Sequence, residues 1–150
     1  MAVKIYWQDV WPEKIDSVER LDIMWDKLVL YAKKVLRPDT EVTMGHPEVS
    51  GIFLQYPYLE LLNNRSVIEG VVRAAKSGYD AAMIGCYSDP GLHEARSIVD
   101  IPVTAVGESS MIVGQLLGRK LAVVTVAAGF VPIIEKNIRL LGLESRFIRS

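Results

Sequence analysis

The sequence predicts an α/β fold, namely a doubly wound, mostly parallel sheet with helices on both of its faces. Short β-branched runs alternate with helical apolar patterns along the whole chain. Strand, helix and strand repeated at this spacing imply right-handed crossovers and a parallel sheet that helices cover. The chain has 150 residues, half of them hydrophobic, which is enough for about one domain with a sizeable core.

Six short segments carry the β-branched and apolar composition that is typical of strands. The sequence therefore predicts strands over residues 3–6, 41–44, 81–84, 103–106, 121–126 and 147–148.

Helical patterns lie between these segments. Apolar residues recur at steps of three and four from Val18 to Val35, and Pro38 follows, which predicts a first helix that ends before the proline. Ser66 and Glu69 have capping-box spacing and predict the start of a second helix, which ends near Gly78. The sequence predicts three shorter helices: one capped by Asp89 and opened by Pro90, one capped by Ser109 or Ser110 and ended by Gly118, and one opened by Pro132 and ended by Gly142.

The Gly-Arg-Lys sequence at residues 118–120 is a short break in the pattern of strands and helices. We expect it to separate a first α/β lobe, residues 1–118, from the start of a second, incomplete α/β lobe, residues 119–150.

Composition excludes several classes of function. Lys and Arg number 17 against 18 Asp and Glu, so we expect no nucleic-acid partner. Apolar stretches are shorter than the roughly 20 residues of a membrane span, and the first residues do not look like a leader, so we expect a cytoplasmic protein without a membrane partner. His46 and His93 are isolated, which predicts no metal site, and no glycine-rich nucleotide loop follows a strand.

Cys86 is the single cysteine, and it follows the predicted strand 81–84. Ligands of such sheets bind outside the carboxyl ends of the strands, where the next helix's backbone amides can stabilise a thiolate and bind anions. A small apolar residue that only completes a strand is the other interpretation. The residues alone leave both open.

The segment after this strand resembles a known family. Gly-Cys-Tyr-Ser-Asp-Pro-Gly-Leu at 85–92, Glu-Ala-Arg at 94–96, Asp-Ile-Pro-Val at 100–103 and Gly-Glu-Ser at 107–109 resemble the first-half signature of the hydantoin and allantoin racemases. These belong to the aspartate/glutamate racemase superfamily. The resemblance is specific mainly over residues 80–110, with weaker similarity at Gly45, Pro47 and Ser50 and over 123–125.

The resemblance implies a cofactor-independent racemase in which a cysteine from each of two lobes faces the substrate's stereogenic carbon. One thiolate removes a proton and the other thiol returns it from the opposite face. On this basis Cys86 is a catalytic acid/base and the substrate is a small hydantoin-like or amino-acid molecule. The residues expected to contact the substrate are Gln8, Ser50, Tyr87, Ser88, Glu108 and Thr125.

Two departures from the family accompany these matches. The family's second cysteine lies beyond position 150, so we expect this chain to be a truncated or cleaved product of a longer racemase, and two-base racemisation is not available to one copy. The loop at residues 7–12 differs from the Asn-Pro-Asn loop of hydantoin racemases, which leaves the substrate's identity open.

Other functions stay open from sequence alone. Superfamily relatives decarboxylate or isomerise substrates with one or two cysteines. A non-enzymatic module that binds a small anion at the amides around Ser88 needs only the first lobe. We expect a homo-oligomer in either case.

Overall fold

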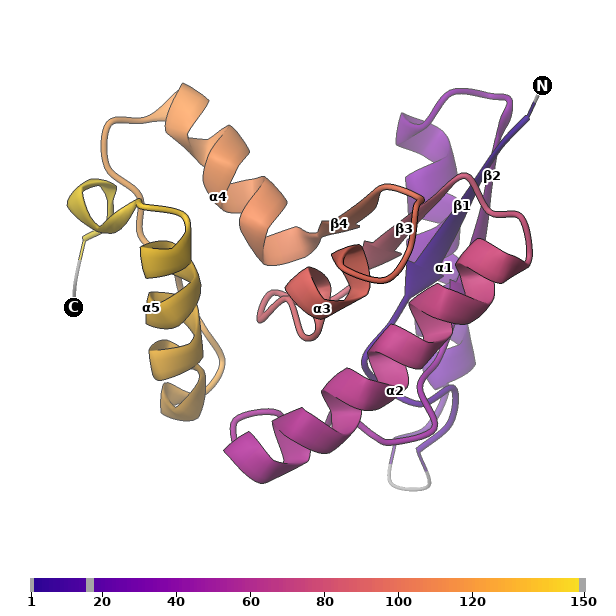
Figure 1. The fold of residues 1–150 in the computed structure, drawn as a ribbon, viewed down its shortest axis with the longest axis horizontal. Helices are drawn as coiled ribbons and strands as arrows, with labels where there is room; N and C mark the ends of the chain where they lie inside the picture. The colour runs from indigo at the N-terminus through magenta and orange to yellow at the C-terminus, as the bar shows by residue number, and fades with distance from the viewer. Residues whose placement is uncertain (1, 16–17, 149–150) are drawn as a thin grey trace.

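A parallel sheet of four strands forms the centre of the computed structural model, which describes residues 2–15 and 18–148 (Figure 1). Its strands are β1 (Val3–Gln8), β2 (Thr40–Gly45), β3 (Ala81–Ile84) and β4 (Val103–Ala105). The strand order is β2-β1-β3-β4, and every neighbouring pair is parallel. The predictions of the first four strands are confirmed to within two residues at either end.

Helices cover both faces of this sheet. Helix α1 (Leu21–Val35) joins β1 to β2 and lies behind the sheet in Figure 1, while α2 (Pro57–Lys76) and the short α3 (Leu92–Arg96) lie in front. The chain therefore winds outward from β1 in one direction and returns in the other, which confirms the doubly wound α/β class. All four carboxyl ends consequently meet at one edge of the sheet.

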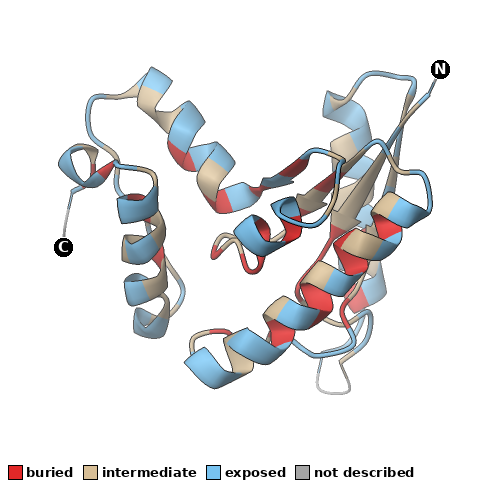
Figure 2. Ribbon diagram, viewed as in Figure 1, coloured by how far each residue is buried: buried red, intermediate tan, exposed pale blue. Residues whose placement is uncertain are grey.

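The main hydrophobic core lies between the sheet and α2 (Figure 2). Val67, Val71 and Ala74 recur at steps of four and three along α2, so their side chains share the face that packs on the strands. Ala82 and Ile84 of β3 meet this face and are fully buried or nearly so. This packing fixes α2 and its loop over the carboxyl edge of the sheet.

A second hydrophobic cluster lies away from the sheet. Helix α4 (Val106–Leu117), η1 (Ala128–Phe130), α5 (Val131–Leu140) and η2 (Glu144–Arg146) surround it. Its buried residues, called here the second cluster, are Met111, Ile134, Ile138, Leu143 and Phe147. Because Met111 comes from α4, the second cluster reaches into the predicted first lobe, and the division at residue 118 stays a prediction.

The strands predicted over 121–126 and 147–148 are wrong. Only one parallel bridge forms there, between Leu121 and Phe147. Val124 and Val126 are 97% and 96% exposed. β-Branched residues favour a strand only where neighbouring strands and a covering layer bury them. The single bridge at Leu121 supplies neither to this segment.

Two helix starts also differ from the prediction. Helix α2 begins at Pro57, and Ser66 lies buried within it, with its hydroxyl accepting a hydrogen bond from the Glu48 backbone N–H at 2.9 Å. Helix α4 begins at Val106, so Ser109 and Ser110 lie inside the helix rather than at its cap. In neither case does the serine that the sequence pattern indicates cap its helix.

The helix ends agree better with the sequence. α1 ends at Val35 ahead of Pro38, and glycines follow the last turns of α2, α4 and α5 near the positions expected. Across residues 2–15 and 18–148, none of the helices combines the length and apolar character that crossing a membrane requires.

Leu54 tests the main core. It is 2% exposed, whereas Leu61 on the outer face of α2 is 65% exposed. We expect Leu54→Ala to lower the free energy of unfolding by about 2–5 kcal/mol, because it leaves a cavity, and Leu61→Ala to change it by less than about 0.5 kcal/mol. Urea unfolding of both variants measures this, and equal losses would contradict the described core.

Candidate functional site

Cys86 lies two residues after Ile84, the last residue of β3, at the carboxyl edge of the sheet. The Gly85 backbone N–H donates to the Gln8 carbonyl at 2.8 Å, which continues the pairing of β3 with β1 up to the cysteine. Glycine fits at position 85 because a Cβ there would clash with the Trp7 indole as it is packed. Cys86 itself is half-buried and packs beside the main core, so it is not sealed among aliphatic side chains.

The Cys86 thiol has a hydroxyl partner in its own turn. Its Sγ lies 3.2 Å from the Ser88 Oγ, and the Asp89 N–H donates to the Cys86 carbonyl at 3.1 Å, which closes the turn. Ser88 is buried. The thiol and hydroxyl therefore form a local pair that the backbone turn fixes.

Burial raises the pKa of Cys86 above its ordinary value. The hydroxyl and backbone N–H of Ser88 oppose this rise, because they stabilise the thiolate, while the Asp9 and Asp89 carboxylates reinforce it. At neutral pH Cys86 is consequently a thiol. We expected backbone amides of the following helix to stabilise the thiolate. The amide that acts on the sulfur instead belongs to Ser88, in the turn before that helix.

Asp9 is a site residue that the sequence analysis missed. It follows β1 directly and is 5% exposed, with its Oδ1 accepting from the Trp11 N–H at 2.8 Å. Burial raises the pKa of Asp9, and the N–H groups of Trp11 and Val10 together with His46 oppose that rise. Its place directly after the first strand, at the same edge as Cys86, is a signal that the sequence contained.

Asn63 of α2 also escaped the sequence analysis. Its side chain is fully buried and its Nδ2 donates to the carbonyls of Val10 and Val49, at 3.1 and 2.7 Å. The two loops that leave β1 and β2 are thereby tied to α2. No local pattern distinguishes this asparagine from its less buried neighbours Leu62 and Asn64.

Asp89 caps a different helix from the one predicted. Its two carboxylate oxygens accept from the Gly107 and Glu108 N–H groups of α4 at 2.7 and 2.6 Å, while α3 begins only after Gly91. Burial raises the pKa of Asp89 to about 6, against the opposing effect of these two N–H groups. The turn that carries Cys86 is thus fastened to the start of α4.

Glu108 and Gly107 complete this attachment. Glu108 receives two hydrogen bonds from the Arg96 guanidinium, at 2.7 and 3.0 Å, which lower its pKa. A Cβ on Gly107 would clash with the Tyr87 carbonyl, so the absence of a side chain lets the turn and α4 lie close together. Glu108 is therefore engaged by Arg96 rather than free at the edge.

The structure separates the other expected contact residues. Tyr87, Ser88 and Glu108 lie around the Cys86 turn. Gln8 is fully buried, and its amide nitrogen donates to the Asp9 and Gly45 carbonyls. Ser50 is exposed in the loop after β2, where its hydroxyl accepts from the Ile52 N–H at 3.3 Å.

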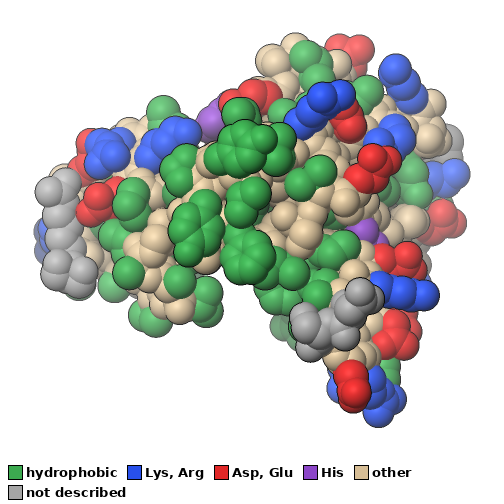
Figure 3. Space-filling model, turned by 90° about the horizontal axis from the view of Figure 1, so that it is seen from below, with side chains coloured by type: hydrophobic (Ala, Val, Ile, Leu, Met, Phe, Trp, Pro, Cys, Tyr) green, Lys and Arg blue, Asp and Glu red, His purple; other side chains and the backbone are tan. Residues whose placement is uncertain are grey.

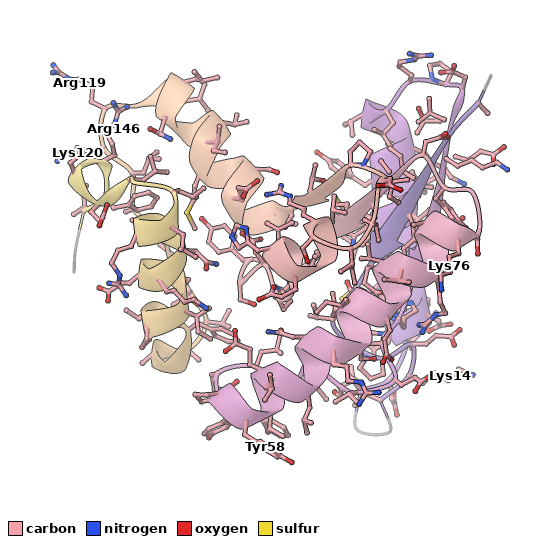
Figure 4. All side chains as sticks on the ribbon, in the orientation of Figure 1. Lys14, Tyr58, Lys76, Arg119, Lys120 and Arg146 are labelled. Carbon is pink, nitrogen blue, oxygen red and sulfur yellow. The ribbon has the colours of Figure 1, made fainter. Side chains whose placement is uncertain are left out.

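Thr125 lies in a small pocket of the second cluster. The pocket has a volume of about 90 Å³ and is lined by Ile134, Ile138 and Phe147 together with polar residues of α5 and η2. Farther along the second cluster, Arg146 and Lys120 bind backbone carbonyls at the end of α4 and in η2 (Figure 4). The lining of this pocket does not include Cys86.

Exposed aromatic side chains flank the start of α2. Phe53, Tyr56 and Tyr58 are 54%, 56% and 69% exposed, and Figure 4 shows Tyr58 at the lower end of the helix. Seen from below, hydrophobic side chains gather across the middle of the molecule (Figure 3).

A family model described as Asp/Glu/Hydantoin racemase matches residues 22–150 of the chain. The chain belongs to this family. It is 32% identical over 117 residues to a hydantoin racemase of Pseudomonas sp. (strain NS671), covering 78% of this chain and 47% of that one. It is 28% identical over 105 residues to a hydantoin racemase of Rhizobium meliloti, covering 70% and 44%. The chain thus spans about half the length of the curated relatives it matches.

A solved structure has the same fold. The allantoin racemase from Klebsiella pneumoniae superimposes with a TM-score of 0.83, covering 97% of this chain and 56% of that chain at 20% sequence identity. This racemase-type α/β fold is the one that the residues 85–92 motif led us to expect.

The role of Asp89 as a cap of α4 can be tested through the free energy of unfolding. We expect Asp89→Ala to lower the free energy of unfolding by about 1–2 kcal/mol, because two N–H groups of α4 lose their acceptors. Asp89→Asn keeps one oxygen acceptor and should recover part of the loss. Asp26→Ala, at an exposed site on α1, is the control, and urea unfolding that finds it as costly as Asp89→Ala would refute the capping role.

Proposed function

We propose that this chain provides the cysteine-bearing lobe of a cofactor-independent racemase, in which Cys86 moves a proton at a carbon next to a carbonyl. The observation that carries the proposal is the position of the half-buried Cys86 Sγ, at the carboxyl edge of the sheet and 3.2 Å from the Ser88 Oγ. Ligands of doubly wound sheets bind at this edge. Membership of the racemase family supports the same reaction.

The proton transfer needs a base that is partly removed from water. A carbon next to a carbonyl is a weak acid, so the base must hold the proton strongly once it has taken it. The Cys86 thiolate removes the proton and becomes a thiol, while the C–H electron pair moves into the carbonyl to form an enolate. Burial favours the neutral thiol and so makes the thiolate the stronger base.

Ser88 has two parts in this proposal. Its hydroxyl and N–H hold the sulfur and limit the rise of its pKa, which keeps some thiolate accessible. Amides of the turn can donate to the developing enolate oxygen, where preorganised donors are most effective. Tyr87, on the same turn, is the other substrate contact that we propose.

The proposed substrate is a small molecule with a hydantoin ring. The curated relatives are named hydantoin racemases, and allantoin, the substrate in the name of the solved structure, also carries this ring. The ring presents a weakly acidic carbon between an amide nitrogen and a carbonyl, as the proposed chemistry requires. Assembly into a homo-oligomer stays a prediction.

The sequence contains one cysteine, so one copy of the chain presents one thiol to one face of the substrate. A proton that Cys86 removes in D₂O exchanges with solvent and returns as deuterium to the same face. We therefore expect incubation of a single enantiomer of a monosubstituted hydantoin with the chain to give deuterium exchange faster than loss of optical rotation. Proton NMR and polarimetry of one sample measure both rates.

Cys86→Ser is the matched variant, because it keeps the size of the side chain and removes the thiolate. Its exchange rate should fall to that of buffer alone. Since burial raises the pKa of Cys86 above its ordinary value, the exchange catalysed by the native chain should still increase with pH beyond the point at which an exposed cysteine is fully ionised. Equal exchange by the native chain and Cys86→Ser would refute the proposed role of the thiol.

A further inference from the structure

We infer that Asn137 of α5 is a positioning residue for Cys86, acting through the carbonyl of Ser88. Its Nδ2 donates to the Ser88 carbonyl at 2.9 Å, across 49 positions of sequence. This contact joins the second cluster to the turn that carries the thiol. The inference deepens the proposed function and rests on it for its significance, because a positioned thiol matters only if Cys86 moves a proton.

Three successive residues of the turn contact the α4 and α5 side of the molecule. The Tyr87 side chain packs against the second cluster. The Ser88 carbonyl accepts from Asn137, and the Asp89 carboxylate accepts from the start of α4. The turn therefore belongs structurally to both hydrophobic clusters, whereas Cys86 itself packs beside the main core.

Asn137 is held firmly enough to position its partner. It lies on α5 between residues whose side chains fill the second cluster, since Ile134 and Ile138 are both buried there. Its own carbonyl accepts from the Leu141 N–H at 3.1 Å, within the regular end of the helix. The position of the Ser88 backbone thus depends on the packing of α5.

Ser88 is the group through which this dependence reaches the sulfur. Both of its donors, the hydroxyl and the backbone N–H, stabilise the Cys86 thiolate. The charged groups that act on the sulfur, Asp9 from the end of β1 and Asp89 from the turn, favour the neutral thiol. Without the Asn137 hydrogen bond the Ser88 donors are free to move from the sulfur, and the thiol pKa rises.

The test measures the thiol itself and needs no substrate. The rate at which Cys86 reacts with dithiodipyridine, followed by absorbance across a pH series, gives the midpoint at which the thiolate forms. Asn137→Ala and Asn137→Leu both remove the donor, and Leu keeps most of the side-chain volume. Lys136→Ala, at the exposed neighbouring position on α5, is the control.

We expect both Asn137 variants to raise the midpoint, and Lys136→Ala to leave it unchanged. A rise of about one pKa unit lowers the rate at neutral pH only about threefold, because the more basic thiolate is also the better nucleophile. A midpoint in Asn137→Leu equal to that of the native chain and Lys136→Ala would overturn the inference. Failure of hydantoin exchange would instead count against the proposed function alone.

A double-variant cycle separates positioning from general destabilisation. Ser88→Ala removes the hydroxyl, the larger of the two Ser88 contributions to the thiolate, so Asn137→Leu should shift the midpoint less in that background. An equally large shift with and without the Ser88 hydroxyl would show that Asn137 acts by another route and would contradict the inference.

Discussion

The parallel pairing of β1 with β3, in which Gln8 lies opposite Ile84, is the constraint on which the candidate site depends. Parallel strands end at the same edge, so this register brings Asp9 and Cys86, each just beyond a strand, to one place. The hydrogen bond from the Gly85 N–H to the Gln8 carbonyl extends the register to the cysteine. The Trp7 indole, which packs closely against Gly85, and the buried Gln8 side chain leave little room for another arrangement.

The same position creates opposing influences on the sulfur. Burial and the Asp9 and Asp89 carboxylates favour the thiol, whereas the hydroxyl and N–H of Ser88 favour the thiolate. A carbon acid needs a base that is strong once formed and still accessible near the working pH. Since Asn137 and the start of α4 hold the turn that carries Ser88 and Asp89, this balance depends on packing in both hydrophobic clusters.

Sequence patterns predicted the parts of the molecule that neighbouring residues determine. The structure has strands close to those predicted to begin at residues 3, 41, 81 and 103, and a helix that ends before Pro38 as predicted. Burial of a periodic apolar face specifies these elements. The 121–126 segment has the same composition but lacks neighbouring strands, so the same reasoning failed there.

Long-range hydrogen bonds account for most of what the sequence did not predict. Ser66 and Asp89 have the residue types and spacing of local caps, yet each binds backbone groups far away along the chain. The side chains of Asn63 and Asn137 donate to backbone carbonyls of loops far away in the sequence, and no local pattern indicates such partners. The motif around Cys86 was recognisable because the residues of the turn are consecutive in sequence. To place Asp9 in the site, the register of β1 with β3 had to be known.

The most direct test of the central proposal, that Cys86 rests as a neutral thiol at a site that binds a hydantoin, is a carbon-13 NMR measurement on the chain labelled at the Cβ of cysteine. One cysteine gives one resonance. At neutral pH the account predicts the chemical shift of a thiol, and a clear change when a monosubstituted hydantoin is added. A thiolate shift at neutral pH, or a resonance that saturating hydantoin leaves unmoved, would contradict the account.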